Sequence, residues 1–232
     1  MKKLLFLMLT ALCVSLVHAN IIITGTRVIY PAEQRLVNVE LTNKTDIPAL
    51  MQAWVDDGDE QSSPNSPSAA ATPFVVVPAV ARMEANAGQT LRITYTGKTP
   101  LPQDRESVFY LNVLDIPPKP KYDPNGSNNY LQIALRSRIK LFYRPNLPMS
   151  QFEAFQAVQW KQAGNLLVVK NPTPYFVTIS LAKVGNTPVK EVGMLAPFSE
   201  KTLPVAVKVG QKVAWSAIND YGSNSALETV VK

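Results

Sequence analysis

The side chains that most often carry out catalysis or bind metals lie at one end of this chain. The single cysteine, Cys13, and the single histidine, His18, are both within the first twenty residues. Cys–His and Ser–His–Asp nucleophiles, histidine-ligated metals and disulfide frameworks all need these residue types. If the first residues are removed, we therefore expect no catalytic residues of these kinds, no metal site and no cofactor.

The first nineteen residues have the pattern of a secretory signal peptide. Lys2 and Lys3 precede an apolar run over 4–17, and Ala19 is a small residue suited to a cleavage site. An uncleaved anchor helix is the alternative, but such a helix needs roughly 20 apolar residues. We expect cleavage after Ala19 and export of a mature chain that begins at Asn20.

Charged side chains are the remaining candidates for chemistry. Paired carboxylates can hydrolyse glycosidic bonds, but the only support for a glycosidase is that Asp and Glu are present. The 23 basic residues include Lys2 and Lys3, so the mature chain keeps 21 against 17 acidic residues. This mild excess forms no basic runs, which argues against nucleic-acid binding. No second long apolar segment follows the leader, so we expect no membrane insertion.

Alternating apolar and polar residues indicate strands through most of the chain. The segments 37–41, 91–95 and 108–113 each place apolar residues on one face. Turn residues recur between such segments at a spacing of about 8–12 residues, which is typical of an antiparallel sandwich. The segment 151–159 is the one weak helix candidate. The sequence therefore predicts an all-β fold.

Three segments interrupt this rhythm. Residues 56–73 and 117–129 are polar and predict two long loops, the first of them flexible. Residues 144–148, Arg-Pro-Asn-Leu-Pro, follow an almost unbroken strand pattern and predict the boundary between two sandwich domains. The predicted division is a signal peptide at 1–19, an N-terminal domain at 20–146 and a C-terminal domain at 147–232.

The strand pattern at 130–144 is unusually long, because a typical strand has about five or six residues. Leu131, Ile133 and Leu135 share one face of it. In one interpretation they pack inside their own domain as part of an ordinary long strand. In the other, this is an edge strand that offers its apolar residues to another chain.

The sequence resembles the periplasmic chaperones of the chaperone–usher pilus pathway. The most specific match is the run LPQDRESVFYLNVLDIP at 101–117. Further matches at 26–31, 139–145, 171–175 and 218–222 occur in the family's order and span nearly the whole mature chain. The resemblance implies two immunoglobulin-like sandwich domains in a boomerang arrangement, no enzymatic activity and a periplasmic location.

In this family the chaperone lends a strand to a pilus subunit whose own sandwich lacks its last strand. The resemblance assigns the donor strand to 129–140, with the three aliphatic residues named above entering the subunit's groove. It assigns Arg27 and Lys140 to binding of the subunit's C-terminal carboxylate. It assigns Glu106, Arg144 and Asp220 to an ionic bridge between the domains.

The implied partners are pilus or fimbrial subunits, the adhesin and the outer-membrane usher, and the free chain could self-associate to hide its apolar edge. The alternative is a structural or adhesive pilus sandwich, although such subunits usually carry a disulfide and a terminal donor extension. The moderate loop at 117–129 and the lack of a Cys pair resemble the short-loop subfamily. Val77-Pro78-Ala79 departs from the usual Thr-Pro-Pro, and the loop at 56–73 is longer than usual.

Overall fold

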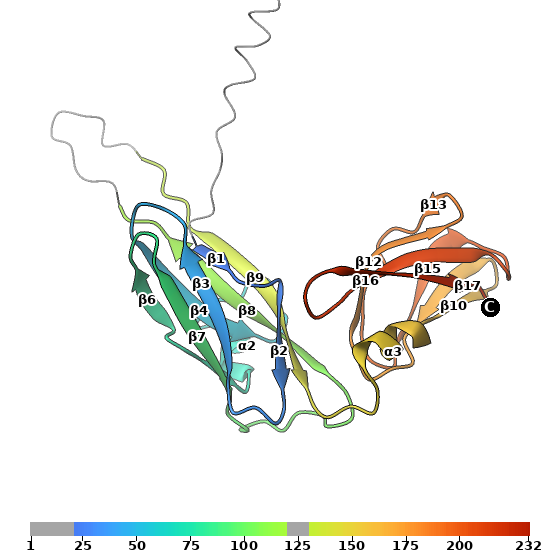
Figure 1. Ribbon diagram of the computed structural model, residues 1–232, viewed down its shortest axis with the longest axis horizontal. Coiled ribbons are helices and arrows are strands. Elements are labelled where there is room, and N and C mark those ends of the chain that lie inside the picture. Colours follow the sequence, from blue (N-terminus) through green and yellow to red (C-terminus); the bar gives the residue numbers. More distant parts are fainter. Residues whose placement is uncertain (1–20, 120–129) are drawn as a thin grey trace, which may run out of the picture.

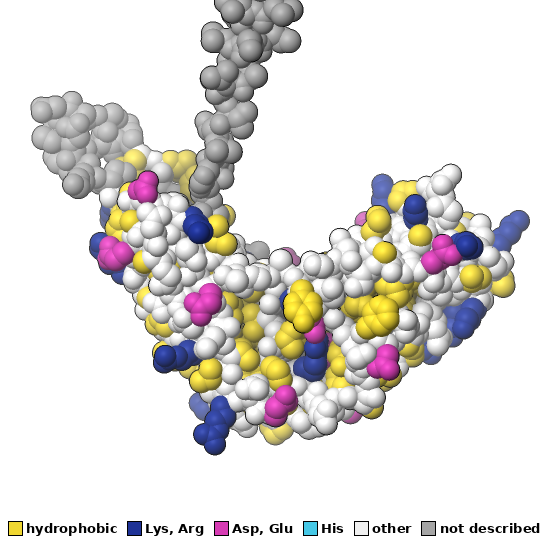
Figure 2. All heavy atoms as spheres, viewed as in Figure 1, with side chains coloured by type: hydrophobic (Ala, Val, Ile, Leu, Met, Phe, Trp, Pro, Cys, Tyr) yellow, Lys and Arg dark blue, Asp and Glu magenta, His cyan; other side chains and the backbone are white. Residues whose placement is uncertain are grey.

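The computed structural model of the 232-residue chain describes residues 21–119 and 130–232 (Figure 1). The predicted signal peptide at 1–19 and most of the predicted loop at 117–129 lie outside the described residues. The rest of the chain forms two lobes set at an angle, each made almost entirely of strands. Figure 2 shows the hollow between the lobes, where hydrophobic and charged side chains meet.

The first lobe consists of two sheets packed face to face. Its strands are β1 (Ile21–Ile23), β2 (Arg27–Pro31), β3 (Val37–Asn43), β4 (Ala49–Asp56), β5 (Phe74–Val77), β6 (Val80–Met83), β7 (Gly88–Tyr95), β8 (Ser107–Ile116) and β9 (Leu135–Arg144). One sheet has the order β1-β3-β7-β5 and the other β2-β9-β8-β4-β6. Neighbouring strands are antiparallel except β2 and β9, which are parallel.

The alternation seen in the sequence buries one face of each sheet. In β3, Val39 and Leu41 are buried, and in β9, Leu141 and Tyr143 are buried on the facing sheet. Ile139 packs against the same core. The odd-numbered residues of β9 therefore point into the core, and the even-numbered residues point away from it.

The second lobe is a smaller sandwich. Its elements are α3 (Gln151–Ala157), β10 (Gln159–Ala163), β11 (Leu166–Lys170), β12 (Val177–Val184), β13 (Thr187–Pro188), β14 (Gly193–Leu195), β15 (Glu200–Ala206), β16 (Lys212–Ile218) and β17 (Asn224–Val230). The sheets have the orders β10-β11-β15 and β13-β12-β16-β17, with β14 beside β12. Trp160 and Trp215 meet in its core with ring centroids 5.9 Å apart. The predicted all-β fold of two sandwich domains is confirmed.

The predicted helix at 151–159 is present as α3 and ends two residues earlier. Ser150 caps it: its hydroxyl accepts from the backbone N–H of Glu153, whose carboxylate accepts from the N–H of Ser150. This reciprocal pair satisfies N–H groups that have no partner inside the helix. It also fixes where the chain enters the second lobe.

The prediction of a long flexible loop at 56–73 is wrong in two places. Asp56 is the last residue of β4 and is fully buried, and Pro67–Ala71 form a short helix, α2, capped by Ser66. The sequence predicts Asp56 to be part of a polar loop because the residues that pair with it in β8 and β9 lie far along the chain. The Val77–Pro78 bond, in the departure from the usual Thr-Pro-Pro, is cis.

Candidate functional site

Strand β9 has a free edge over its first half. On one side β8 pairs with all of β9, from Tyr143 to Leu135. On the other side β2 pairs only with 140–144, beginning at Arg27 opposite Lys140. Among the described residues, 135–139 therefore have a strand partner on one side only. An unpaired edge presents N–H and C=O groups that can accept another strand.

Of the predicted donor residues, Leu135 begins this free edge and Leu131 and Ile133 precede it, and all three are exposed. The exposed fractions are 84% for Leu131, 65% for Ile133 and 48% for Leu135. The interpretation in which they pack inside their own domain is therefore wrong. A contiguous group of exposed aliphatic side chains is typical of a binding surface rather than of ordinary protein surface.

The prediction of a strand from residue 130 onwards is also wrong, because β9 begins at Leu135. The reason lies in the neighbouring strand. Leu135 pairs with Asp115, and β8 ends one residue later at Ile116, so β8 has only one residue left for the five residues 130–134. A strand pattern in the sequence cannot form a ladder without a partner strand.

The two predicted anchor residues, Arg27 and Lys140, are brought together as directly opposed residues of the parallel pair β2–β9. Both side chains reach toward the second lobe. Arg27 Nη1 donates to the carbonyl of Ile218 at 3.1 Å, and Lys140 Nζ donates to Oγ1 of Thr178 at 3.2 Å. Neither forms an ion pair with the described residues. The sequence analysis missed both acceptors, which carry no sequence signal for this contact.

Burial and neighbouring charges shift the pKa values of both cations. Burial lowers the pKa of Arg27, while the carboxylates of Asp220 and Glu106 act in the opposite direction. Burial, and then the charge of Arg27, lower the pKa of Lys140. Arg27 Nε is buried with no hydrogen-bond partner among the described residues. A bound carboxylate would supply the missing acceptor and the missing negative charge.

The three residues predicted to bridge the domains are also in contact. Arg144 Nε lies 2.7 Å from Glu106 Oε1, and its Nη1 and Nη2 lie 2.6 and 2.8 Å from the two oxygens of Asp220. Glu106 and Arg144 belong to the first lobe, and Asp220 lies in the β16–β17 turn of the second. Burial would lower the pKa of Arg144, but the hydrogen bonds and charges of the two acids raise it.

Two further groups support this ionic bridge and were missed from the sequence. The backbone N–H of Phe176 donates to Glu106 Oε2 at 2.7 Å, and Gln151 Nε2 donates to Asp220 Oδ1 at 2.6 Å. Glu106 is 3% exposed, so each of its oxygens needs such a partner. Burial raises the pKa of Glu106 against the opposing charge of Arg144.

The β16–β17 turn also packs tightly against the first lobe. Gly222 has a φ of +82°, and a Cβ built on it would overlap the hydroxyl of Thr26 and lie 3.3 Å from its Cβ. Asn219 Oδ1 accepts from the N–H groups of Tyr221 and Ser223, which fixes the turn. Glycine is therefore needed at 222 both for the backbone conformation and for the close approach of the two lobes.

A metal site and a membrane-spanning helix are both absent from the part of the chain that the structure describes. No group of three or more Asp, Glu, His or Cys residues there is arranged to hold a metal ion. No helix in the same ranges is both long enough and apolar enough to cross a membrane.

Comparison with known proteins identifies the family. Residues 20–148 match the family model described as the pili and flagellar-assembly chaperone, PapD N-terminal domain, and residues 153–229 match the pili assembly chaperone PapD, C-terminal domain. Chaperone protein HifB of Haemophilus influenzae is 48% identical over 226 residues, covering 95% of this chain and 92% of HifB.

Solved structures agree with this result. The crystal structure of the YadV chaperone has a TM-score of 0.76 and 39% identity, covering 91% of this chain and 100% of that one. A chain from the Salmonella enterica SafA pilin in complex with the SafB chaperone has a TM-score of 0.77 and 28% identity, covering 93% and 98%. The chain therefore belongs to the PapD-like family of pilus-assembly chaperones.

Proposed function

We propose that this chain is a periplasmic chaperone that binds pilus subunits by donating them a strand, and that it acts without catalysing a reaction. The observation that carries the proposal is the free edge of β9, which runs from the exposed Leu135 to the cation pair at Arg27 and Lys140. A subunit strand added at this edge would continue the sheet past the end of β2.

The aliphatic residues supply the affinity. Leu131, Ile133 and Leu135 have the same parity as the core-facing Ile139, so an extended donor strand presents them on one face. Burying such a side chain is worth about 1.5–3 kcal/mol, so three contribute about 5–9 kcal/mol before the cost of ordering the strand. That range suits a complex that is stable yet can later exchange its donor strand.

The cation pair supplies the register. A shift of one residue would turn every aliphatic side chain of the donor strand away from the groove. A subunit carboxylate bound between Arg27 and Lys140 would fix one end of the subunit's strand at the point where β2 stops pairing. Charge-assisted hydrogen bonds to a carboxylate are stronger than neutral ones, so this contact can select a single register.

The ionic bridge would keep this site assembled. The acceptors of Arg27 and Lys140, Ile218 and Thr178, belong to the second lobe, and Arg144 joins that lobe to the first through Asp220. Loss of the bridge would release the two cations from their present positions. We assign Glu106, Arg144 and Asp220 this orienting role.

The partners follow from the family. Its members are named as fimbrial chaperones, and solved relatives include a chaperone–pilin and a chaperone–tip subunit complex. We propose that this chain binds subunits and the adhesin of one fimbrial system and delivers them to an outer-membrane usher. The predicted signal peptide at 1–19 would bring it to the periplasm.

The test is co-purification from the periplasm with a subunit co-expressed from the same gene cluster. The wild-type chain should recover the subunit, and Arg27→Ala and Lys140→Ala should not, although both variants fold. Arg92→Ala and Lys208→Ala remove exposed cations elsewhere on the surface and should behave as wild type. Full recovery by both anchor variants would refute the anchor assignment.

A further inference from the structure

The outer face of β9, directly behind its free edge, is held by the connection that follows β4. We call residues 57–66 of this connection the strap. Arg136 and Arg138 are the even-numbered residues of the free-edge segment, so their side chains point away from the core and toward the strap. Arg136 contacts the strap itself, whereas Arg138 contacts Asp56, the last residue of β4.

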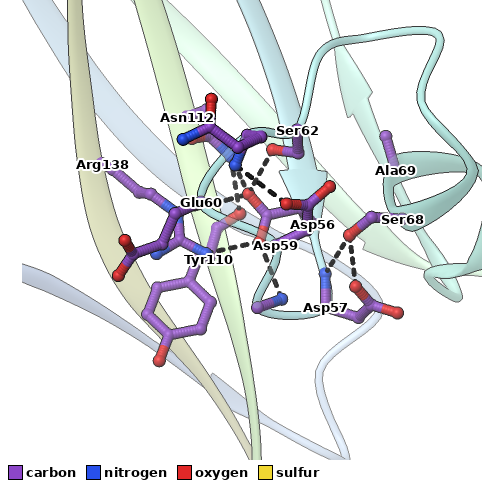
Figure 3. Close-up of polar contacts among 12 residues, drawn as sticks. Asp56, Asp57, Asp59, Glu60, Ser62, Ser68, Ala69, Tyr110, Asn112 and Arg138 are labelled. Atoms are coloured by element: carbon purple, nitrogen blue, oxygen red, sulfur yellow. Dashed lines mark hydrogen bonds and ion pairs between the residues drawn. The ribbon is translucent and has the colours of Figure 1, made fainter.

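Arg138 is held by the buried carboxylate of Asp56 (Figure 3). Its Nη2 lies 2.7 Å from Asp56 Oδ1 and its Nε 3.3 Å from Oδ2. Ser62 Oγ and Asn112 Nδ2 donate to Oδ2 at 2.7 and 2.6 Å, and the N–H of Gly58 donates to Oδ1 at 2.8 Å. The carboxylate therefore joins the strap, β8 and β9 at one point.

An aromatic ring also contacts the guanidinium of Arg138. Its guanidinium carbon lies 3.7 Å from the centroid of the Tyr110 ring on β8. A guanidinium stacked on a ring and paired with a buried carboxylate has little freedom to move. Hydrogen bonds from Arg138, Ser62, Asn112 and Gly58 outweigh the effect of burial and lower the pKa of Asp56, so this acid stays ionised near neutral pH.

Arg136 is held by backbone carbonyls of the strap. Its Nη1 donates to Ser62 O at 2.8 Å, and its Nη2 donates to Glu60 O. Ser62 is 4% exposed and its hydroxyl accepts from Trp54 Nε1 at 3.1 Å. The strap is thus tied to β4 on one side and to β9 on the other.

These contacts lie where the sheet gives β9 least support. Residues 135–139 pair with β8 alone, and Leu135 is opposite Asp115, the residue before the end of β8. Strand ends with one neighbour open locally at low free-energy cost. On the outer face the strap contacts Arg136 directly, and it reaches Arg138 through the carboxylate of Asp56. These contacts leave the open edge and the core-facing side chains free.

We propose that Asp56 and Ser62 are positioning residues that hold the free-edge segment of β9 extended, through Arg138 and Arg136, before a subunit binds. The proposal rests on the donor role assigned to this edge. A segment that is already extended loses less conformational freedom on pairing, so binding is tighter and faster. Because coupling is reciprocal, a bound subunit should in turn protect the strap.

Peptide-level hydrogen exchange on the free, full mature chain tests this without any subunit. Arg136→Gln and Asp56→Asn should speed exchange at 135–139 about ten-fold or more, as expected for the loss of one or two hydrogen bonds. Arg136→Lys keeps the charge but has one donor nitrogen in place of the two that arginine uses, so it should restore part of the protection. Arg82→Gln removes an exposed ion pair between Arg82 of β6 and Glu84 and should change nothing at 135–139.

A merely structural role would give a different pattern. Exchange that rises equally in β3, β7 and 135–139, or that stays unchanged at 135–139, would overturn the proposal. Arg136→Gln decides the matter if Asp56→Asn does not fold, because Arg136 bonds only to carbonyls of the strap.

A second measurement adds a subunit co-expressed from the same gene cluster. Its association rate should fall about ten-fold in Arg136→Gln, and a wild-type rate in a variant with fast exchange would overturn the positioning role. A wild-type chain that binds no subunit would instead contradict the proposed function. The exchange result on the free chain stands independently of that outcome.

Discussion

Arg27 and Lys140 lie directly opposite each other in the parallel pair β2–β9, carry like charges, and donate hydrogen bonds to neutral acceptors of the second lobe. Two half-buried cations without an acid partner are costly unless an anion joins them. The two cations lie at the end of the free edge of β9, next to the residues that could pair with another strand.

Binding of a carboxylate to the cation pair should weaken at alkaline pH. Because the pKa of Lys140 is lowered by burial and by Arg27, its charge is lost at lower pH than that of an ordinary lysine. Affinity for a peptide copying the last residues of the subunit should be full below this pKa and fall as the pH rises through it. Titration calorimetry over a pH series measures the effect.

The matched ligand for that experiment is the same peptide with an amidated C-terminus, which should bind weakly with little change over this pH range. Lys140→Arg should remove the alkaline loss, because arginine stays charged. An identical pH profile for the acid and the amide would show that the carboxylate does not bind at this pair.

Exposed donor residues should matter for binding and not for folding. Ile133→Ser changes a side chain that is 65% exposed, so the free energy of unfolding should stay within error of wild type. Subunit affinity should fall at least ten-fold, since burial of an isoleucine is worth about 1.5–3 kcal/mol. Leu181→Ser, at a position 59% exposed in β12, is the control and should keep full affinity.

Removing Arg144 should cost more stability than removing its less buried partner, Asp220. In Arg144→Gln the carboxylate of Glu106 stays buried and loses its cation, which typically costs about 3–5 kcal/mol. Asp220→Asn should cost less, about 1 kcal/mol, because the Asp220 side chain is 26% exposed against 1% for Glu106 and asparagine keeps one acceptor oxygen. Urea unfolding measures both, and Lys212→Gln, which removes an exposed ion pair, should equal wild type. Equal losses for Arg144→Gln and Asp220→Asn would contradict the account.

A methyl group at Gly222 should push the lobes apart. Both Gly222 and Gly210 have positive φ, but only at 222 would a new Cβ overlap another residue, Thr26. Gly210→Ala therefore measures the backbone strain alone. Small-angle scattering should show a changed shape for Gly222→Ala and none for Gly210→Ala, and subunit recovery should fall only in the former. The same scattering curve for both variants would mean that the turn does not set the interlobe contact.

The fold could be predicted from the sequence because alternation is a local signal. The alternation in 37–41 and 108–113 predicts which face of each strand is buried, and the spacing of Leu131, Ile133 and Leu135 places them on one face. Their donor role was predicted only through the family resemblance. The start of β9 could not be predicted, since it depends on where β8 ends. The residue at which a strand begins is determined by its pairing with the neighbouring strand and cannot be predicted from its own sequence alone.

The site was predicted in part through family resemblance, and its remaining residues have no local signal. Thr178 and Ile218 accept bonds from residues 38 and 191 positions away, and only the packing of the two lobes brings them together. Asp56 looked like part of a polar loop because Arg138, its partner, is 82 positions distant. Long-range pairs of this kind are invisible to patterns that extend over a few residues.

The most direct test of the account is a crystal structure of the chain bound to its subunit. We predict that a subunit strand pairs with 135–139 of β9, that Leu131, Ile133 and Leu135 enter the subunit's core, and that its C-terminal carboxylate contacts both Arg27 and Lys140. A complex in which this edge of β9 is unpaired and the subunit binds another surface would contradict the account.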